Sequence, residues 1–267
     1  MTGERRRVLA IDIDEVLGHF VLKLCHFHNE KFGTVLTPED FKSYYFHEVW
    51  GGTRASADEK MRDFFESPHF LDGIPVVPGA ERVLRKHASN FELHIVTSRQ
   101  DILREHTREW VEAHFPGVFD GRLHFGNHFG SGAQRSKPEL CRSIQADLII
   151  DDNMRYATQC AEAGIPAYLF GDYAWNRTGE PLPKNVRRTV SWDQVDAELE
   201  AFLLDGGSGC KEQSDQTAAA VVEQGGGGAA AQQNNGTGTA VSNRKASQQP
   251  AADVASALRE EPLTCAA

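Results

Sequence analysis

The sequence predicts an α/β protein with a doubly wound parallel sheet and a small helical insertion after the first strand. The first strand is an unbroken apolar run, Val8 to Ile11, of the kind found in strands that are buried on both faces. From residue 79 to residue 204, strands alternate with helices, which requires crossover connections between parallel strands. Polar residues follow several of these strands, as expected where ligands bind at the carboxyl ends of a parallel sheet.

The insertion extends from about residue 18 to residue 72. Apolar residues recur at helical spacing over 20–32, which predicts its first helix. In the stretch LTPEDF, Thr37 is a candidate N-cap and Pro38 the first helical residue. A further helix is expected over 56–67, so the insertion is mostly helical and rich in aromatic residues.

After the insertion, helices and strands follow one another in a regular order. This order is typical of right-handed crossovers between parallel strands, and the sequence contains no internal repeat. The expected elements are helix 79–88, strand 91–96, helix 100–114, strand 122–125, helix 137–145, strand 147–150, helix 153–163, strand 166–170 and a final helix over about 191–204.

The composition changes after Asp205. Residues 206–267 contain no Phe, Trp or Tyr and include runs of glycine, alanine, glutamine and asparagine. Such a segment cannot bury a hydrophobic core. We therefore expect residues 1–205 to form one domain that contains the helical insertion, and residues 206–267 to be a disordered low-complexity tail.

Charge, hydropathy and cysteine spacing narrow the class of protein. The formal net charge is −10, which argues against a groove for a nucleic-acid polymer. No apolar run approaches membrane-spanning length and the amino terminus lacks a signal-peptide core, so we expect no membrane partner and a cytoplasmic location. The five cysteines are scattered without a CxxC pair, which favours reduced thiols over a disulfide framework or a zinc site.

Two aspartates, Asp12 and Asp14, follow the first strand with one residue between them. The two-residue period of an extended chain puts both side chains on the same side. Carboxylates held that close repel each other. We therefore expect a bound divalent cation to compensate for their charge.

Three further polar clusters are expected at the same edge of the sheet. A lone DxD carries little information because it occurs often by chance, but four clusters in this order indicate a site. The segments VTSR, SKPEL and LIIDDN contribute Thr97, Ser98, Arg99, Lys137, Asp151 and Asp152.

These groups suit phosphoryl transfer. Asp12 can attack phosphorus and form a covalent intermediate, which divides one difficult displacement into two easier ones. Asp14 is a candidate acid and then base, which protonates the leaving oxygen and later activates water. Thr97 can donate hydrogen bonds to a non-bridging phosphate oxygen, and Lys137 can neutralise the same group.

The acidic residues also predict a metal. Asp151 and Asp152 add hard oxygen ligands to those of Asp12 and Asp14. Zinc would prefer His or Cys, whereas magnesium takes few carboxylates and keeps several waters. The expected cofactor is therefore Mg²⁺.

The ordered set DIDEV, VTSR, SKPEL and IIDD resembles the four motifs of the haloacid dehalogenase (HAD) superfamily of phosphohydrolases. The insertion is similar to the helical cap of that superfamily. The short IIDD motif resembles that of the 5′(3′)-deoxyribonucleotidase group, the cytosolic type C nucleotidases. The resemblance spans residues 8–176 and implies a HAD-like, Rossmann-like fold.

The resemblance also implies a role for most of the motif residues. It makes Asp12 the aspartyl-phosphate nucleophile and Asp14 the acid/base, which also offers Mg²⁺ its backbone carbonyl. Thr97, Ser98 and Lys137 become the residues that bind phosphate.

Two positions in these motifs do not take a role directly from the resemblance. Asp152 is favoured as the direct metal ligand because it lies further past the strand end, and Asp151 would support Lys137 or a metal-bound water. Glu15 stands where the commonest form of the first motif has glycine. We expect its side chain to narrow the loop without altering the chemistry.

The cap would decide the substrate, and here the sequence leaves alternatives open. Phe20 and Trp50 are candidates to stack on a nucleobase, and packing inside the cap is an equally good interpretation. The segment GDYAWNR, residues 171–177, resembles a substrate-side loop of the same group; alternatively, Trp175 seals the sheet edge.

The first hypothesis is a Mg²⁺-dependent phosphomonoesterase with an aspartyl-phosphate intermediate, a 5′-nucleotidase that acts on (deoxy)nucleoside monophosphates. Its partner is then a small phosphorylated metabolite. One alternative is a HAD phosphatase for another metabolite such as a sugar phosphate. Another is a catalytically idle HAD-like binding module whose tail recruits a partner. The sequence leaves the oligomeric state open, a homodimer included.

Overall fold

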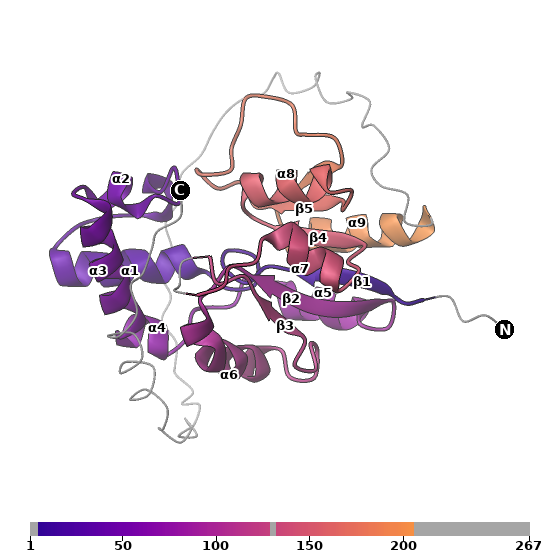
Figure 1. Ribbon diagram of the computed structural model, residues 1–267, viewed down its shortest axis with the longest axis horizontal. Coiled ribbons are helices and arrows are strands. Elements are labelled where there is room, and N and C mark those ends of the chain that lie inside the picture. The colour runs from indigo at the N-terminus through magenta and orange to yellow at the C-terminus, as the bar shows by residue number, and fades with distance from the viewer. Residues whose placement is uncertain (1–4, 129–131, 206–267) are drawn as a thin grey trace, which may run out of the picture. The chain divides into compact units, whose positions relative to one another are not determined.

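The computed structural model describes residues 5–128 and 132–205, and within these residues six parallel strands form one sheet (Figure 1). The order of the strands is β3-β2-β1-β4-β5-β6. The doubly wound parallel sheet that the sequence predicts is confirmed. The strands are β1 (Arg7–Ile11), β2 (Phe91–Thr97), β3 (Leu123–Phe125), β4 (Leu148–Asp151), β5 (Ala167–Phe170) and β6 (Val186–Thr189).

The direction of winding reverses at the centre of the sheet, between β1 and β4. Strands β2 and β3 lie on one side of β1, and β4, β5 and β6 lie on the other. Ile11 near the end of β1 is paired with Ile95 of β2 and with Ile150 of β4. The loops that follow β1 and β4 therefore start side by side, at the point where doubly wound sheets bind their ligands.

Helices cover both faces of the sheet. Leu9 and Ile11 of β1 belong to a core that includes side chains of α5, α6 and α9, whereas Ala10 belongs to a core with side chains of α7 and α8. This alternation is the two-residue period of a strand that is buried on both sides. The helices are α5 (Ala80–His87), α6 (Arg104–His114), α7 (Lys137–Ser143), α8 (Met154–Glu162) and α9 (Trp192–Leu204).

The segment from residue 18 to residue 72 is mostly helical, as expected for the insertion, and Figure 1 shows its helices grouped together. The ring of Phe64 is central to its core. Its centroid lies 5.3 Å from that of Phe20, 5.5 Å from that of Phe27 and 5.4 Å from that of Phe70. The elements of this segment are α1 (Phe20–Phe32), the 3-10 turn η1 (Pro38–Asp40), α2 (Phe46–Trp50), α3 (Arg54–Phe65) and α4 (Pro68–Leu71).

Local hydrogen bonds explain where two of these elements begin. The carboxylate of Asp40 accepts a hydrogen bond from the backbone N–H of Thr37 at 2.7 Å, which closes the short turn η1. Thr37 is the N-cap of that turn, as the sequence predicts. Helix α3 begins two residues earlier than the expected 56–67, because Thr53 caps it by accepting from the backbone N–H of Ser56.

Three parts of the pattern differ from expectation. Strand β6 was not expected, since its sequence VRRT carries Arg187 and Arg188 in place of an apolar run. The helix expected over 100–114 begins as a 3-10 turn, η2 (Asp101–Leu103), before α6. The four- and five-residue helices α4 and α2 are too short to produce a helical period in the sequence.

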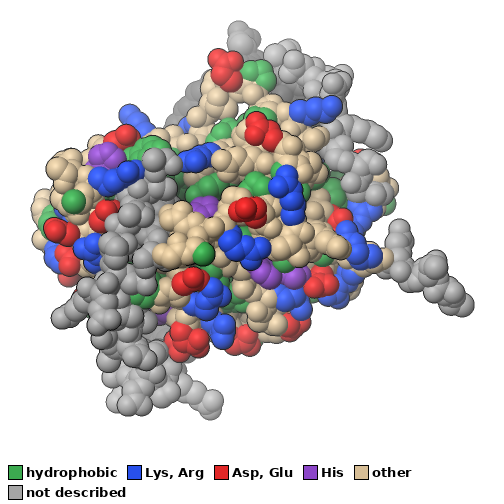
Figure 2. Space-filling model, in the orientation of Figure 1, with side chains coloured by type: hydrophobic (Ala, Val, Ile, Leu, Met, Phe, Trp, Pro, Cys, Tyr) green, Lys and Arg blue, Asp and Glu red, His purple; other side chains and the backbone are tan. Residues whose placement is uncertain are grey.

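The surface shows no dominant sign of charge on the face drawn in Figure 2, where acidic and basic side chains are interspersed. Of the helices that the described residues form, none has the length and apolar character needed to cross a bilayer. The tail predicted over 206–267 lies outside the described residues.

Substituting Phe64 by alanine tests the aromatic core of the insertion. Phe64 is fully buried, so the Phe64→Ala variant should lose about 3–5 kcal/mol of unfolding free energy, measured by urea denaturation. Phe32 is 40% exposed and provides the matched control, because Phe32→Ala should cost much less. Equal losses in the two variants would contradict the packing described here.

Candidate active site

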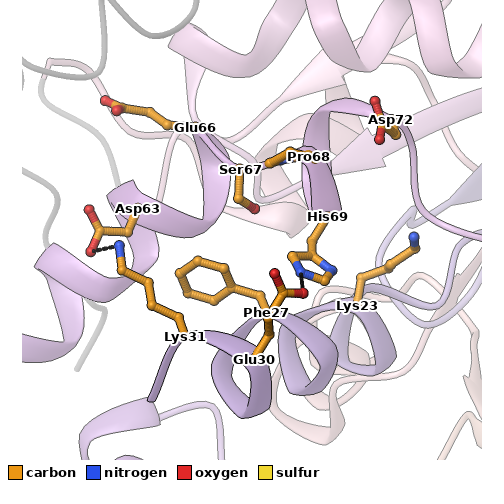
Figure 3. Close-up of a pocket in the computed structure, with 10 residues that line it drawn as sticks. All are labelled: Lys23, Phe27, Glu30, Lys31, Asp63, Glu66, Ser67, Pro68, His69 and Asp72. Carbon is orange, nitrogen blue, oxygen red and sulfur yellow. Dashed lines mark hydrogen bonds and ion pairs between the residues drawn. The ribbon is translucent and has the colours of Figure 1, made fainter. Parts of the chain in front are cut away.

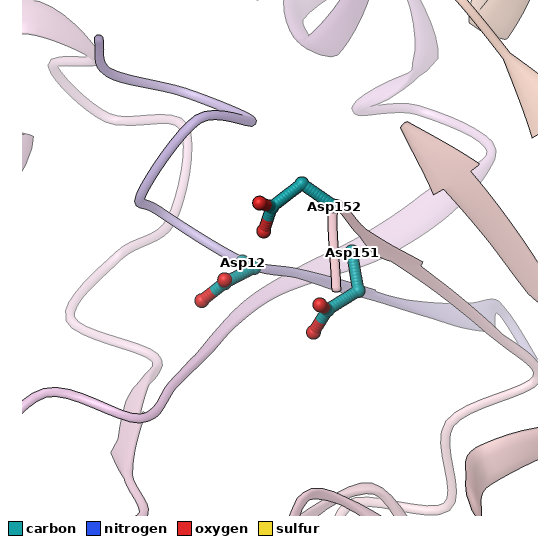
Figure 4. A group of neighbouring side chains, drawn as sticks. All are labelled: Asp12, Asp151 and Asp152. Carbon is teal, nitrogen blue, oxygen red and sulfur yellow. The ribbon is translucent and has the colours of Figure 1, made fainter. Parts of the chain in front are cut away.

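Three carboxylates meet where the strand order reverses. Asp12 follows β1, and its backbone N–H donates to the carbonyl of Ile150 in β4 at 3.0 Å. Asp151 ends β4 and Asp152 follows it. A ligand oxygen from each of Asp12, Asp151 and Asp152 lies within 4.8 Å of the others, and Figure 4 shows the three side chains around one space.

Lys137 supplies a cation to this group. It is the first residue of α7, it is fully buried, and its Nζ lies 2.8 Å from Asp12 Oδ1 and 2.6 Å from Asp151 Oδ2. Ser136 caps the helix, and Pro138 follows within its first turn. Burial alone would lower the pKa of Lys137, but the adjacent carboxylates of Asp12 and Asp151 raise it above its ordinary value.

The charge of the three carboxylates exceeds that of Lys137. Burial raises the pKa of Asp12 to about 7 even though Lys137 opposes the shift. Burial, reinforced by the charges of Asp151 and Asp12, also raises the pKa of Asp152 well above its ordinary value. The carboxylates provide hard oxygen ligands, and one ammonium balances only part of their negative charge. This combination of ligand atoms and excess negative charge suits Mg²⁺.

Asp152 is held by donors from two distant segments. The hydroxyl of Tyr44, in the loop between η1 and α2, donates to Asp152 Oδ2. The indole Nε1 of Trp175, in the loop after β5, donates to the same oxygen at 2.8 Å. The side-chain amide of Asn176 donates to the backbone carbonyl of Asp152 at 2.8 Å. Sequence reasoning missed Tyr44, which has no local signature there.

Asp14 points to a different partner. Its Oδ1 lies 2.7 Å from Arg99 Nη2 and its Oδ2 lies 3.1 Å from Arg99 Nε. In the part of the chain that the structure describes, its carboxylate is not one of the three that are close enough to share a metal. The expected repulsion between Asp12 and Asp14 is thus relieved by separate cations, Lys137 for one and Arg99 for the other.

The two hydroxyl residues after β2 are placed differently. Ser98 lines the pocket that contains Asp12 and Asp152. Thr97 is fully buried, does not line that pocket, and accepts a hydrogen bond from the backbone N–H of Arg99 at 3.2 Å. Of the two expected phosphate donors, Ser98 is therefore the one at the pocket wall.

The pocket around these groups has a volume of about 440 Å³. It is lined by Asp12, Asp14, Ser98 and Asp152. The rest of the lining consists of residues 42–45 of the cap segment, residues 153–156 at the start of α8, and Trp175. Pockets of this size commonly hold a small molecule.

The expectation that Phe20 and Trp50 stack on a substrate base is not supported, because neither residue lines the pocket. Phe20 is 8% exposed and packs edge-on against Phe64 inside the cap. Trp50 stacks on His28 at 5.0 Å and on Phe46 at 5.1 Å. The alternative, packing inside the cap, describes both. The aromatic residues at the pocket are instead Tyr44, Tyr45, Tyr156 and Trp175.

Glu15 turns away from the pocket. Its φ of +64° is a conformation that favours glycine, which agrees with the commonest form of the motif. Its Oε1 accepts a hydrogen bond from the backbone N–H of Val21 at 2.6 Å, in the first turn of α1. The hydroxyl of Tyr173 donates to the Glu15 carbonyl at 2.8 Å. The extra side chain therefore caps a helix whose own N-cap residue, His19, makes no side-chain cap.

A second pocket, of about 630 Å³, lies on the cap between α1 and the segment from α3 to α4 (Figure 3). Lys31 and Asp63 form an ion pair across it at 2.7 Å, and His69 and Glu30 form another contact at 2.8 Å. It contains none of the motif residues, so the site is the pocket at the sheet.

Comparison with known proteins agrees with this geometry. Residues 6–199 match the family model described as 5′ nucleotidase, deoxy (pyrimidine), cytosolic type C protein. The chain belongs to this family. It is therefore a HAD-type phosphoric monoester hydrolase, and the resemblance expected from the four motifs is confirmed.

Individual relatives are more distant. A 5′(3′)-deoxyribonucleotidase from Clostridium acetobutylicum is 25% identical over 145 residues, which cover 54% of this chain and 72% of the relative. A predicted phosphatase from the same organism superposes with a TM-score of 0.54 at 14% identity, covering 74% of this chain and all of that one. A haloacid dehalogenase-like protein from Agrobacterium tumefaciens gives a TM-score of 0.55 at 10% identity, with coverage of 74% and 100%. These two structures share the fold.

Replacing Glu15 by glutamine should change how stability depends on pH. Burial raises the pKa of Glu15 from 4.5 to about 8. The folded protein therefore keeps a proton that the unfolded chain loses, and the resulting stabilisation is complete below pH 4.5 and lost as the pH rises through about 8. The free energy of unfolding of the wild type, relative to Glu15→Gln, should fall between pH 5 and pH 8 in urea titrations. A difference that stays constant with pH would contradict the shift.

Proposed function

We propose that this protein is a Mg²⁺-dependent phosphomonoesterase that forms an aspartyl-phosphate on Asp12 and acts on (deoxy)nucleoside 5′-monophosphates. Asp12, Asp14 and Asp152 line one pocket, and the buried Nζ of Lys137 lies 2.8 Å from Asp12 Oδ1; this arrangement supports the proposal. A nucleophile and a candidate acid/base thus share one substrate-sized space, and a buried cation is paired with the nucleophile.

The residues present fit magnesium. Asp12 and Asp152 would hold the ion through carboxylate oxygens, Asp14 through its backbone carbonyl, and Asp151 would support it while paired with Lys137. When bound, Mg²⁺ supplies positive charge that stabilises the charge on the transferring phosphoryl group.

Asp12 is the nucleophile in this proposal. Its oxygen forms a bond to phosphorus as the bond from phosphorus to the leaving oxygen breaks, and the leaving oxygen takes a proton from Asp14. Lys137 stays paired with Asp12 and Asp151 and stabilises negative charge on the phosphoryl oxygens. Ser98 is the residue after β2 that lines the pocket, and Thr97 fixes the turn beside it by accepting from the backbone N–H of Arg99.

The second half of the reaction releases phosphate. Asp14 takes a proton from water as the water oxygen attacks phosphorus, and the carboxylate of Asp12 leaves, so that inorganic phosphate and the starting enzyme result. The side chain of Asp14 is 24% exposed and lines the pocket, so it is accessible to both the leaving oxygen and the water.

The size and lining of the pocket support a mononucleotide as substrate. A volume of about 440 Å³ suits a small phosphate ester, and Tyr45 and Trp175 offer aromatic surfaces to a base. The name of the matching family and that of its Clostridium relative both describe nucleotidases. The word cytosolic in the family's description likewise supports a cytoplasmic enzyme.

Removing the nucleophile or the metal tests the reaction. Asp12→Asn should lower kcat by about 10⁴-fold or more, because the amide cannot form the acyl phosphate. A chelator should abolish phosphate release and added Mg²⁺ should restore it. Asp72→Asn, at the second pocket, is the matched control and should leave kcat unchanged. A panel of nucleoside monophosphates and sugar phosphates then tests the substrate class. Full activity in Asp12→Asn, or indifference to the chelator, would refute the mechanism.

We also propose that residues 1–205 carry the whole activity. A chain that ends at Asp205 should keep kcat and KM within about twofold and its melting temperature within about 2 °C, because residues 5–128 and 132–205 already contain the lining of the pocket and all six strands of the sheet described above. Steady-state assays and calorimetry on both lengths give the comparison. A large loss of turnover in the shorter chain would assign a role in catalysis to residues 206–267.

A further inference from the structure

We propose that Arg99 is a positioning residue for the reaction, acting through Asp14 and not on the phosphate itself. This inference rests on the proposed function, in which Asp14 is the acid and base. Arg99 is the last residue of the VTSR motif, and neither the motif comparison nor the mechanism above gives it a role in the reaction.

The contact between the two side chains is a two-point fork. Arg99 Nη2 donates to Asp14 Oδ1 at 2.7 Å, and Arg99 Nε donates to Asp14 Oδ2 at 3.1 Å. A planar guanidinium that binds both oxygens fixes the plane of the carboxylate as well as its position. An unrestrained aspartate side chain would instead sample several rotamers.

Arg99 is itself held in place by contacts from two helices. Its Nη1 donates to Thr107 Oγ1 in α6 at 3.0 Å, and its Cζ lies 5.6 Å from the ring centroid of Phe70 in α4. Its backbone N–H is bound by Thr97 at 3.2 Å. Its side chain is only 5% exposed. The guanidinium is therefore a fixed reference point for Asp14.

The location of Arg99 separates this role from phosphate binding. Asp14 lines the 440 Å³ pocket and Arg99 does not, so the carboxylate is the member of the pair that borders the pocket, and the arginine is the more buried one. Lys137 is the cation paired with the nucleophile Asp12. The two cations thus serve different groups, and an effect of Arg99 on the reaction has to pass through Asp14.

The chemistry of the first half-reaction makes this role measurable. Asp14 gives a proton to the leaving oxygen while the bond between that oxygen and phosphorus breaks. A leaving group that is stable as an anion needs this proton much less than one that is not. A misplaced Asp14 should therefore slow esters with poor leaving groups and spare those with good ones.

The experiment compares two esters of similar size, phenyl phosphate and p-nitrophenyl phosphate, on the full-length protein with Mg²⁺. The quantity compared is kcat/KM, since it covers only the steps up to the first irreversible loss of the leaving group. Arg99→Gln should lower kcat/KM about tenfold or more for phenyl phosphate and less than about threefold for p-nitrophenyl phosphate.

Four further variants sharpen the test. Arg99→Lys should retain part of the rate, because an ammonium replaces the fork with a point contact. Thr107→Val keeps the ion pair between Arg99 and Asp14 but removes the hydrogen bond that anchors Arg99. It should produce the same pattern as Arg99→Gln, a larger loss of kcat/KM for phenyl phosphate than for p-nitrophenyl phosphate, with smaller losses for both esters. This variant provides the test if Arg99→Gln does not fold. In the Asp14→Asn background, Arg99→Gln should add no further loss. Arg104→Gln is the control, since Arg104 is 43% exposed and paired with Asp101.

Other outcomes would contradict either the role of Arg99 alone or the proposed function as a whole. Equal losses for the two esters, or a full additional loss in the Asp14→Asn background, would overturn the inference about Arg99 and leave the phosphatase mechanism intact. A wild-type protein that releases phosphate from neither ester nor any nucleotide would overturn the proposed function, and the role of Arg99 with it.

Discussion

The buried ion pair of Lys137 with Asp12 and Asp151 is the interaction on which the site depends. Moving carboxylates out of water costs several kcal/mol each unless charge of the opposite sign is close. The strand order puts the ends of β1 and β4 side by side, and that proximity is what crowds the acids together. The first residue of α7, Lys137, lies among these carboxylates, so the fold both crowds the acids together and supplies part of the positive charge that balances them.

The other carboxylates of the site, those of Asp14 and Asp152, are bound by side chains from other segments of the chain. Arg99, two residues after β2, forms an ion pair with Asp14, while Tyr44 and Trp175 donate hydrogen bonds to Asp152. These partners come from segments that are far apart in the sequence and meet only because the sheet and the cap bring their loops to one edge. The pocket is accordingly lined by carboxylates together with several aromatic side chains.

The sequence predicted site residues best where a charged residue stands at a position that is expected to be buried. Charged residues directly after apolar strands located Asp12 and Asp151, because burial there requires a function or a partner, whereas Lys137, at a helix start, was located by its place in the ordered set of motifs. It was least informative for long-range contacts: nothing near Tyr44 indicates that its hydroxyl meets Asp152. Aromatic spacing in the cap could not separate interior packing from substrate contact, and this is why both interpretations of Trp50 stayed open until its contacts with His28 and Phe46 were seen. Strand β6 was missed because its two consecutive arginines break the apolar pattern.

The hydrogen bond from the first turn of α1 to Glu15 links two parts of the molecule mechanically. Glu15 belongs to the same short loop as Asp12 and Asp14, so the opening helix of the cap is tied directly to the backbone that carries both acids. Displacing α1 has to break that bond or drag the loop with it. A hinge for the cap at this connection is consequently stiff, and freedom of movement would have to come from the other connection, between α4 and α5.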